Sequence, residues 1–206
     1  HFKSKEALAT ILWYMALNMC LESIPHTSVK SALTVVIFLL YPIFGMIADI
    51  WWGRYLIITI GIGITWIAAI LIGIYYIFEM SLSHYNINTV LWSLQLSGIG
   101  MFQANALQFA TDQLNNLSSD QFSSFVHWYI WAQEMSGETY IWIMTVVSSI
   151  KYEYFKALQT LSIAVLLSLV LCCHFILQCW WKYESHQKTN PYGLIFRVLK
   201  FAWKHK

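Results

Sequence analysis

Charged residues are scarce in this chain of 206 residues, in which Asp, Glu, Lys and Arg together make up only 11%. A soluble domain carries about 25% of such residues, so the composition argues against an ordinary soluble fold. The net charge is only +2, which gives no reason to expect nucleic acid as a partner. Cysteine is also rare. The four cysteines show neither a CxxC pair nor the histidine spacing of a metal site, and we expect inert, buried thiols.

Apolar residues are abundant instead, at 58% of the chain, and they gather in long runs. A helix that crosses a bilayer core needs about 20 such residues. One apolar run, within residues 1–21, is too short to cross unless part of its helix is missing. Five runs reach the required length, near residues 31–50, 56–78, 90–110, 122–150 and 155–181. The sequence therefore predicts an all-α, multi-pass integral membrane protein with one transmembrane bundle over residues 1–181.

The distribution of Lys and Arg predicts the topology of this bundle. Arg54 and the six Lys and Arg residues of the tail, residues 182–206, fall on one side of the predicted helices. The other side has only Lys30, Lys151 and Lys156. Because short cytoplasmic loops carry the excess of basic residues, we expect the amphipathic tail to be a cytoplasmic segment.

The break between the second and third apolar runs, residues 41–55, carries the most specific pattern. It reads YPIFGMIADIWWGRY. Gly45 is small enough to allow two helices to approach closely. Gly53 permits the unusual backbone angles of a short loop. Asp49 and Arg54 can pair where the chain leaves the lipid, and we expect them to act in structure and gating rather than in ligand contact.

This pattern resembles the loop between helices two and three of major facilitator transporters, and the proton-dependent oligopeptide transporters in particular. Two later segments are similar to signatures of the same family. Residues 125–136 resemble its fifth-helix signature, "FxxFYWxINxGS", and residues 98–114 its fourth-helix signature, "GTGGIKPN…FGADQF". The positions that match the fourth-helix signature are Gly98, Gly100, Asn105, Phe109, Asp112 and Gln113.

The resemblance implies the six-helix N-terminal half of a major facilitator fold, with its first helix truncated and its C-terminal six-helix half as the missing partner. It implies secondary active transport of small solutes, di- and tripeptides first among them, with protons as the candidate coupling ion. The family's acidic ExxER motif would lie before His1, and Gln103 stands where the family has a Lys. A non-transporting or sensor-like relative that has lost proton coupling therefore remains the alternative.

Glu134 and Glu138 are the candidate proton or substrate groups within the predicted fifth helix. They lie four residues apart and share a face with His127 and Trp131. A carboxylate in a membrane helix is costly and usually faces a cavity or a partner, so it can handle a proton or a ligand amine. The open alternative is a carboxylate that only bonds neighbouring helices.

Gln103 and Asn105 are the candidate substrate contacts of the fourth helix, since a neutral amide can donate to a substrate carboxylate, although without charge assistance. The alternative for Gln103 is a polar contact between helices. Asp112 and Gln113 would anchor the loop that follows. The sequence offers no nucleophile beside a base and no phosphate-binding glycine loop, so we expect neither an enzyme nor a cofactor or metal site.

Overall fold

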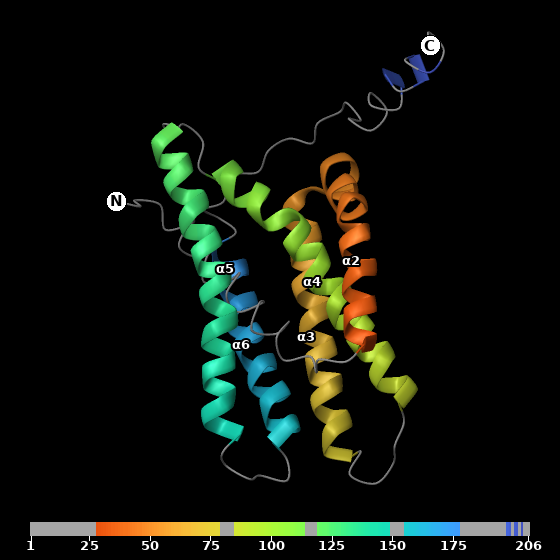
Figure 1. Ribbon diagram of the computed structural model, residues 1–206, viewed down its shortest axis with the longest axis vertical. Coiled ribbons are helices and arrows are strands. Elements are labelled where there is room, and N and C mark those ends of the chain that lie inside the picture. The colour runs from red at the N-terminus through yellow and green to blue at the C-terminus, as the bar shows by residue number, and fades with distance from the viewer. Residues whose placement is uncertain are drawn as a thin grey trace.

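The chain is helical in nearly all the residues that the computed structural model describes, which are 28–78, 85–113, 119–148, 155–177, 197, 198, 200, 201 and 203. Consecutive helices run in alternating directions along one bundle (Figure 1). The predicted segment within residues 1–21 and the predicted tail, apart from its few described residues, lie outside this part. The helices are α2 (Ser28–Ile47), η1 (Ala48–Trp52), α3 (Arg54–Phe78), α4 (Tyr85–Gln113), α5 (Ser119–Ser148) and α6 (Phe155–Leu177).

Three of the described helical segments are long and apolar enough to cross a membrane, namely Ala32–Trp52, Arg54–Phe78 and Ala157–Ile176. They indicate a membrane protein. Helix α4 has 29 residues and α5 has 30. At a rise of 1.5 Å per residue both exceed a bilayer core of about 30 Å. They do not reach the same apolarity because polar side chains such as Gln95 and Glu134 interrupt them. The five predicted spans thus correspond to five long helices, of which two are markedly more polar.

The junction between α2 and α3 is tighter than the predicted hydrophilic loop. The helix continues from α2 through one π-helical segment, η1, and only Gly53 separates it from α3. The amide of Gly53 donates to the carbonyl oxygen of Ala48 at 2.8 Å, and Gly53 has φ 79°. A side chain would strain that backbone, so Gly53 fills the role expected for it. Trp51 and Trp52 are exposed beside it, as suits aromatic residues at a membrane interface.

Helix α3 lies at the centre of the described bundle and packs against both α4 and α6. It approaches α4 most closely where two glycines meet. A Cβ atom on Gly61 would lie 2.7 Å from the carbonyl oxygen of Gly98, and one on Gly98 would lie 2.5 Å from that of Gly61. The absence of both side chains therefore sets the distance between the two backbones.

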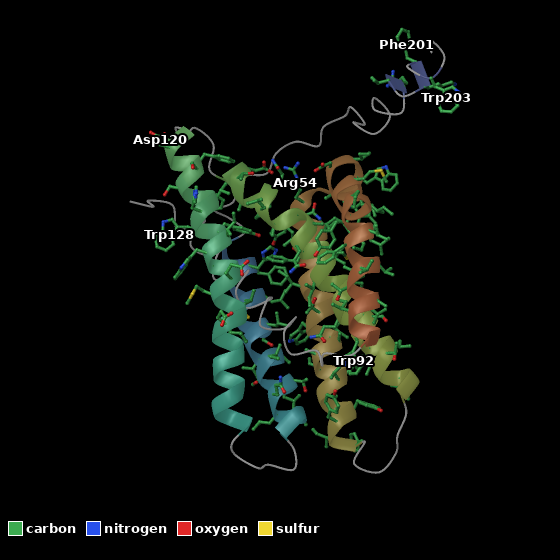
Figure 2. The ribbon with its side chains drawn as sticks, viewed as in Figure 1. Arg54, Trp92, Asp120, Trp128, Phe201 and Trp203 are labelled. Carbon is green, nitrogen blue, oxygen red and sulfur yellow. The ribbon has the colours of Figure 1, made fainter. Side chains whose placement is uncertain are left out.

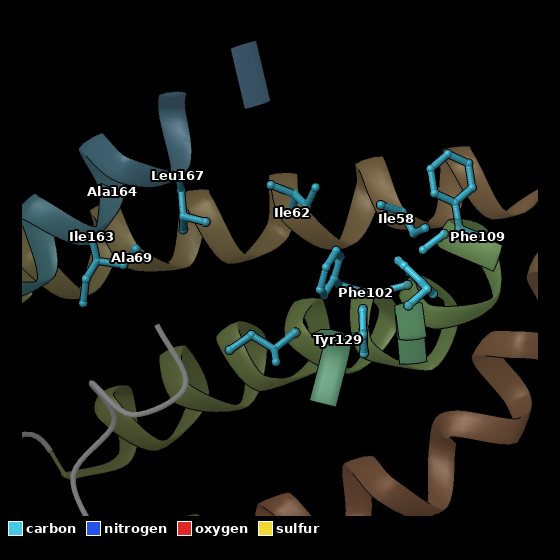
Figure 3. Packing of buried hydrophobic residues seen from close by; sticks show 13 residues of the cluster. Ile58, Ile62, Ala69, Phe102, Phe109, Tyr129, Ile163, Ala164 and Leu167 are labelled. Carbon is cyan, nitrogen blue, oxygen red and sulfur yellow. The ribbon is translucent and has the colours of Figure 1, made fainter. Parts of the chain in front are cut away.

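The main hydrophobic core runs from the end of the bundle that carries Gly53, past this crossing, to Ala69 of α3. Figure 3 shows Ile58 and Ile62 of α3 facing Phe102 of α4, with Leu167 reaching in from α6. Helix α5 joins the cluster through Tyr129 and its neighbours. Each of these side chains is almost completely buried. A smaller cluster of Ile72, Trp92 and Leu96 fills the opposite end.

Two sequence-based expectations about small residues were wrong. A Cβ atom on Gly45 would meet nothing within 4 Å, so Gly45 is not a point of close approach between the helices that the structure describes. Cys172 and Cys173 are exposed rather than buried. The inward side of α6 is occupied by Ile163, Leu167 and other residues at helical spacing, which leaves the two cysteines outside that stripe.

Candidate functional site

Arg54 lies between two carboxylates at the end of the bundle where α3 begins and α4 ends (Figure 2). Its Nε donates to Asp49 Oδ1 at 2.9 Å, and its Nη2 lies 2.9 Å from the same oxygen. Its Nη1 donates to Asp112 Oδ2. We call these three residues the Arg54 cluster. The predicted contact between Asp49 and Arg54 is confirmed, and the cluster joins η1, α3 and α4 by charge.

The sequence predicted a structural role for Asp112, as an anchor for the following loop, but not its contact with Arg54. The signal that could have found it is the register of an antiparallel helix pair. Arg54 precedes the break between α3 and α4 by about as many residues as Asp112 follows it, so pairing the helices brings the two together. Gln108 supports the arrangement by donating its amide to Asp112 Oδ1 at 3.2 Å. Gln113 ends α4, and its side chain lies outside the described part.

The cluster is partly shielded from solvent. The side chains of Arg54, Asp49 and Asp112 are 22%, 34% and 12% exposed. Water can therefore reach the ion pairs. Even so, all three nitrogens of the guanidinium contact carboxylate oxygens. A planar guanidinium matches carboxylates in a way that an ammonium group cannot. The arrangement links the ends of η1, α3 and α4 through charged contacts that solvent can reach.

The two amides of α4 do not converge on one site. The hydroxyl of Tyr41, on α2, donates to Gln103 Oε1. Asn105 is buried and donates its Nδ2 to the carbonyl oxygen of Met101 at 2.9 Å. Residues two positions apart on an α-helix are related by about 200° of rotation, so Gln103 and Asn105 lie on nearly opposite sides of α4. The structure shows for Gln103 the helix–helix contact that sequence analysis left open.

The predicted stripe on α5 points away from the bundle. Among the α5 side chains that the structure describes, Phe125, Tyr129 and Ala132 are buried. Each is followed two residues later by an exposed position, His127, Trp131 and Glu134. Two residues are about 200° of rotation, so this second set lies on the opposite side. Glu138 is exposed one turn beyond Glu134. Trp128, beside the stripe, also projects outward (Figure 2).

The predicted partners of the α5 stripe are therefore not neighbouring helices of the described bundle. His127 bonds within its own helix, where its Nδ1 donates to the carbonyl oxygen of Ser123 at 2.7 Å. Glu134 and Glu138 remain on the outer surface. Within residues 28–78, 85–113, 119–148 and 155–177, no three His, Cys, Asp or Glu side chains gather in a way that could hold a metal ion.

Comparisons of the chain with protein-family models and with curated proteins find no match in either case. The resemblance to oligopeptide transporters thus rests on the residues and motifs themselves.

Proposed function

We propose that this chain is a multi-pass membrane protein and forms one six-helix half of a secondary transporter for small solutes, with di- and tripeptides as the first candidates. The observation that carries the proposal is the Arg54 cluster. Charged contacts join the ends of three helices at one end of a bundle whose main core cluster is apolar. Transporters that work by alternating access need contacts at the bundle end that form in one state and break in another.

The outward polar face of α5 supports the second part of the proposal. Charged side chains at mid-membrane depth face a water-filled cavity or a protein partner, because exposure to lipid is costly. Glu134 lies near the middle of a 30-residue helix, and it is exposed on the side opposite the bundle. In the proposed transporter, this face lines the solute pathway opposite a second six-helix half, with protons as the coupling ion.

A sensor-like relative without transport is the second candidate, and one contact favours it. Gln103 occupies the position where the resembled family has a Lys, and its amide oxygen already accepts from Tyr41. A substrate carboxylate would meet no cation there. Such a protein would keep the ligand-binding scaffold and lose the driving force.

Uptake by the protein reconstituted in liposomes together with its second half separates these candidates. Accumulation of a labelled dipeptide under an inward proton gradient supports the transporter. Dipeptide binding seen by thermal shift without uptake supports the sensor. Neither uptake nor binding would overturn both.

The Asp49→Asn variant tests the role assigned to the Arg54 cluster in the same assay. The substitution removes one carboxylate at the edge of the membrane, far from a solute at its midplane. We expect a lower maximal rate with little change in solute affinity. A large loss of affinity at normal rate would show instead that Asp49 contacts the solute.

A further inference from the structure

A buried histidine of α6 packs against the first turn of α3, directly beside the Arg54 cluster. His174 is only 2% exposed. Its ring stacks on the ring of Tyr55, with centroids 4.5 Å apart and planes inclined by 11°. Tyr55 follows Arg54 in the chain. The sequence predicts no site at His174, because His84, His174 and His186 are dispersed along the chain.

The hydrogen bonds of Thr59 determine how His174 is bound. The Thr59 hydroxyl has one hydrogen, which it donates to the carbonyl oxygen of Tyr55 at 2.8 Å. The same oxygen lies 2.7 Å from His174 Nε2, so it must accept a hydrogen from that nitrogen. His174 therefore carries a hydrogen on Nε2 and reaches the backbone of Tyr55 through Thr59. His174 thus contacts the ring of Tyr55 by stacking and its carbonyl group through the Thr59 hydroxyl.

Tyr55 also connects this contact to α4. The centroid of its ring lies 6.4 Å from that of Phe109, one turn before Asp112. Gly53, just before Arg54, is held by backbone contacts: its amide donates to the carbonyl oxygen of Ala48, and its own carbonyl oxygen accepts from the amide of Ile57. The first amides of a helix also lack partners within that helix. The contacts made by Tyr55 and Thr59 therefore add side-chain support to the first turn of α3.

We propose that His174 is a positioning residue for the Arg54 cluster, acting on Arg54 through Thr59 and Tyr55. A shift of α6 relative to α3 would move Tyr55, turn the first residues of α3 and redirect the guanidinium relative to Asp112. The cluster would then respond to α6, a helix that contributes no charge to it. This inference rests on the proposed function only for what the cluster controls, since the geometry is independent of transport.

Modification of arginine by phenylglyoxal can test the proposal, because the chain has two arginines. Arg54 is held by carboxylates, and Arg197 is exposed and serves as an internal reference. The ratio of the two modification rates, measured by mass spectrometry on the full chain in membranes, reports how firmly Arg54 is held. Asp112→Asn gives the response expected when one carboxylate no longer carries charge.

Two threonines on α3 provide a matched pair of variants. Thr59→Val removes the hydroxyl that links His174 to Tyr55, while Thr59→Ser keeps it. Thr65→Val removes an equivalent bond, from Thr65 Oγ1 to the carbonyl oxygen of Gly61 at 2.8 Å, at a position away from His174. We expect a several-fold rise in the ratio for Thr59→Val and for His174→Leu. We expect no change for Thr59→Ser or Thr65→Val.

An unchanged ratio in both Thr59→Val and His174→Leu, with a clear rise in Asp112→Asn, would overturn the proposal. An equal rise in Thr65→Val would also overturn it, because the effect would then be general loosening of α3. The ratio of modification rates is measured without a solute. A protein that fails to transport but shows the expected ratios would refute the proposed function and leave the positioning role intact.

Discussion

The charges of the Arg54 cluster lie at helix ends whose own dipoles disfavour them. Arg54 is the first residue of α3, where the backbone already presents a partial positive charge. Asp112 is next to the last residue of α4, and Asp49 lies near the end of the continuous helix formed by α2 and η1. Each such placement costs about 0.3–1 kcal/mol near the surface. The ion pairs offset these costs, so the loss of any one partner leaves the others in unfavourable positions.

Replacing Arg54 by Lys tests whether the shape of the guanidinium matters as well as its charge. Lysine keeps the positive charge at the start of α3 but cannot hold both carboxylates in the same planar arrangement. We expect Arg54→Lys to lower the free energy of unfolding by about 1–2 kcal/mol. Thermal unfolding in detergent would show this as a lower midpoint. Arg197→Lys, at an exposed position, is the control and should melt like the parent. Equal unfolding midpoints for Arg54→Lys and Arg197→Lys would mean that a positive charge at position 54 is enough for stability, whatever the shape of the side chain.

Elements were more predictable than the contacts between them. The long apolar runs gave α3 and α6 nearly at their observed bounds. The predicted loop around residues 79–89 was too long, because α4 already begins at Tyr85. The asparagines there have low helix propensity, which packing in the bundle can override. At the start of α5, Asp120 lies in the first turn and suits the dipole, so α5 begins a few residues earlier than predicted.

The candidate site was predictable only where its partners are close in sequence. Asp49 and Arg54 are five residues apart and were expected to pair. The contact from Tyr41 to Gln103 joins residues 62 apart, and that from Thr59 to His174 joins residues 115 apart. Helical periodicity shows which side of a helix is buried, but it does not show which neighbour covers that side. The cross-helix contacts therefore had to come from the structure.

The crossing of α3 and α4 gives a sharp test at the scale of elements. In Gly98→Ala the added Cβ would lie 2.5 Å from the carbonyl oxygen of Gly61, so the two backbones must separate. Overpacking of this kind costs about 1–3 kcal/mol, and we expect a loss of stability in that range. Gly63→Ala is the matched control on α3, because its Cβ would meet nothing within 4 Å. Thermal unfolding of both variants, in one detergent, measures the difference. Equal stability would show that the glycine contact does not set the helix spacing.

At the scale of the whole molecule, the described bundle has two kinds of outer surface. The outer side of α2 is apolar, with Val35, Phe38 and Leu39 exposed, and is suited to lipid. The outer side of α5 carries Glu134 and Glu138, which follow the exposed Trp128 and Trp131. Lipid can cover the first surface at no cost, whereas the second needs water or protein. In the proposed transporter, this asymmetry favours α5, rather than α2, as the helix that faces the solute pathway.

The last prediction concerns Glu134, the carboxylate nearest the middle of α5. Glutamine has almost the same size and hydrogen-bonding reach but cannot carry a proton, so Glu134→Gln separates proton handling from packing. In the protein reconstituted with the proposed second half, we expect this variant to lose accumulation of solute driven by a proton gradient. Exchange of solute without a gradient should persist, because the pathway keeps its shape. The control is Asp120→Asn, an exposed carboxylate at the start of the same helix, which should leave both activities unchanged. Full gradient-driven accumulation in Glu134→Gln would make Glu134 a structural polar residue of the α5 surface and remove it from the proton pathway.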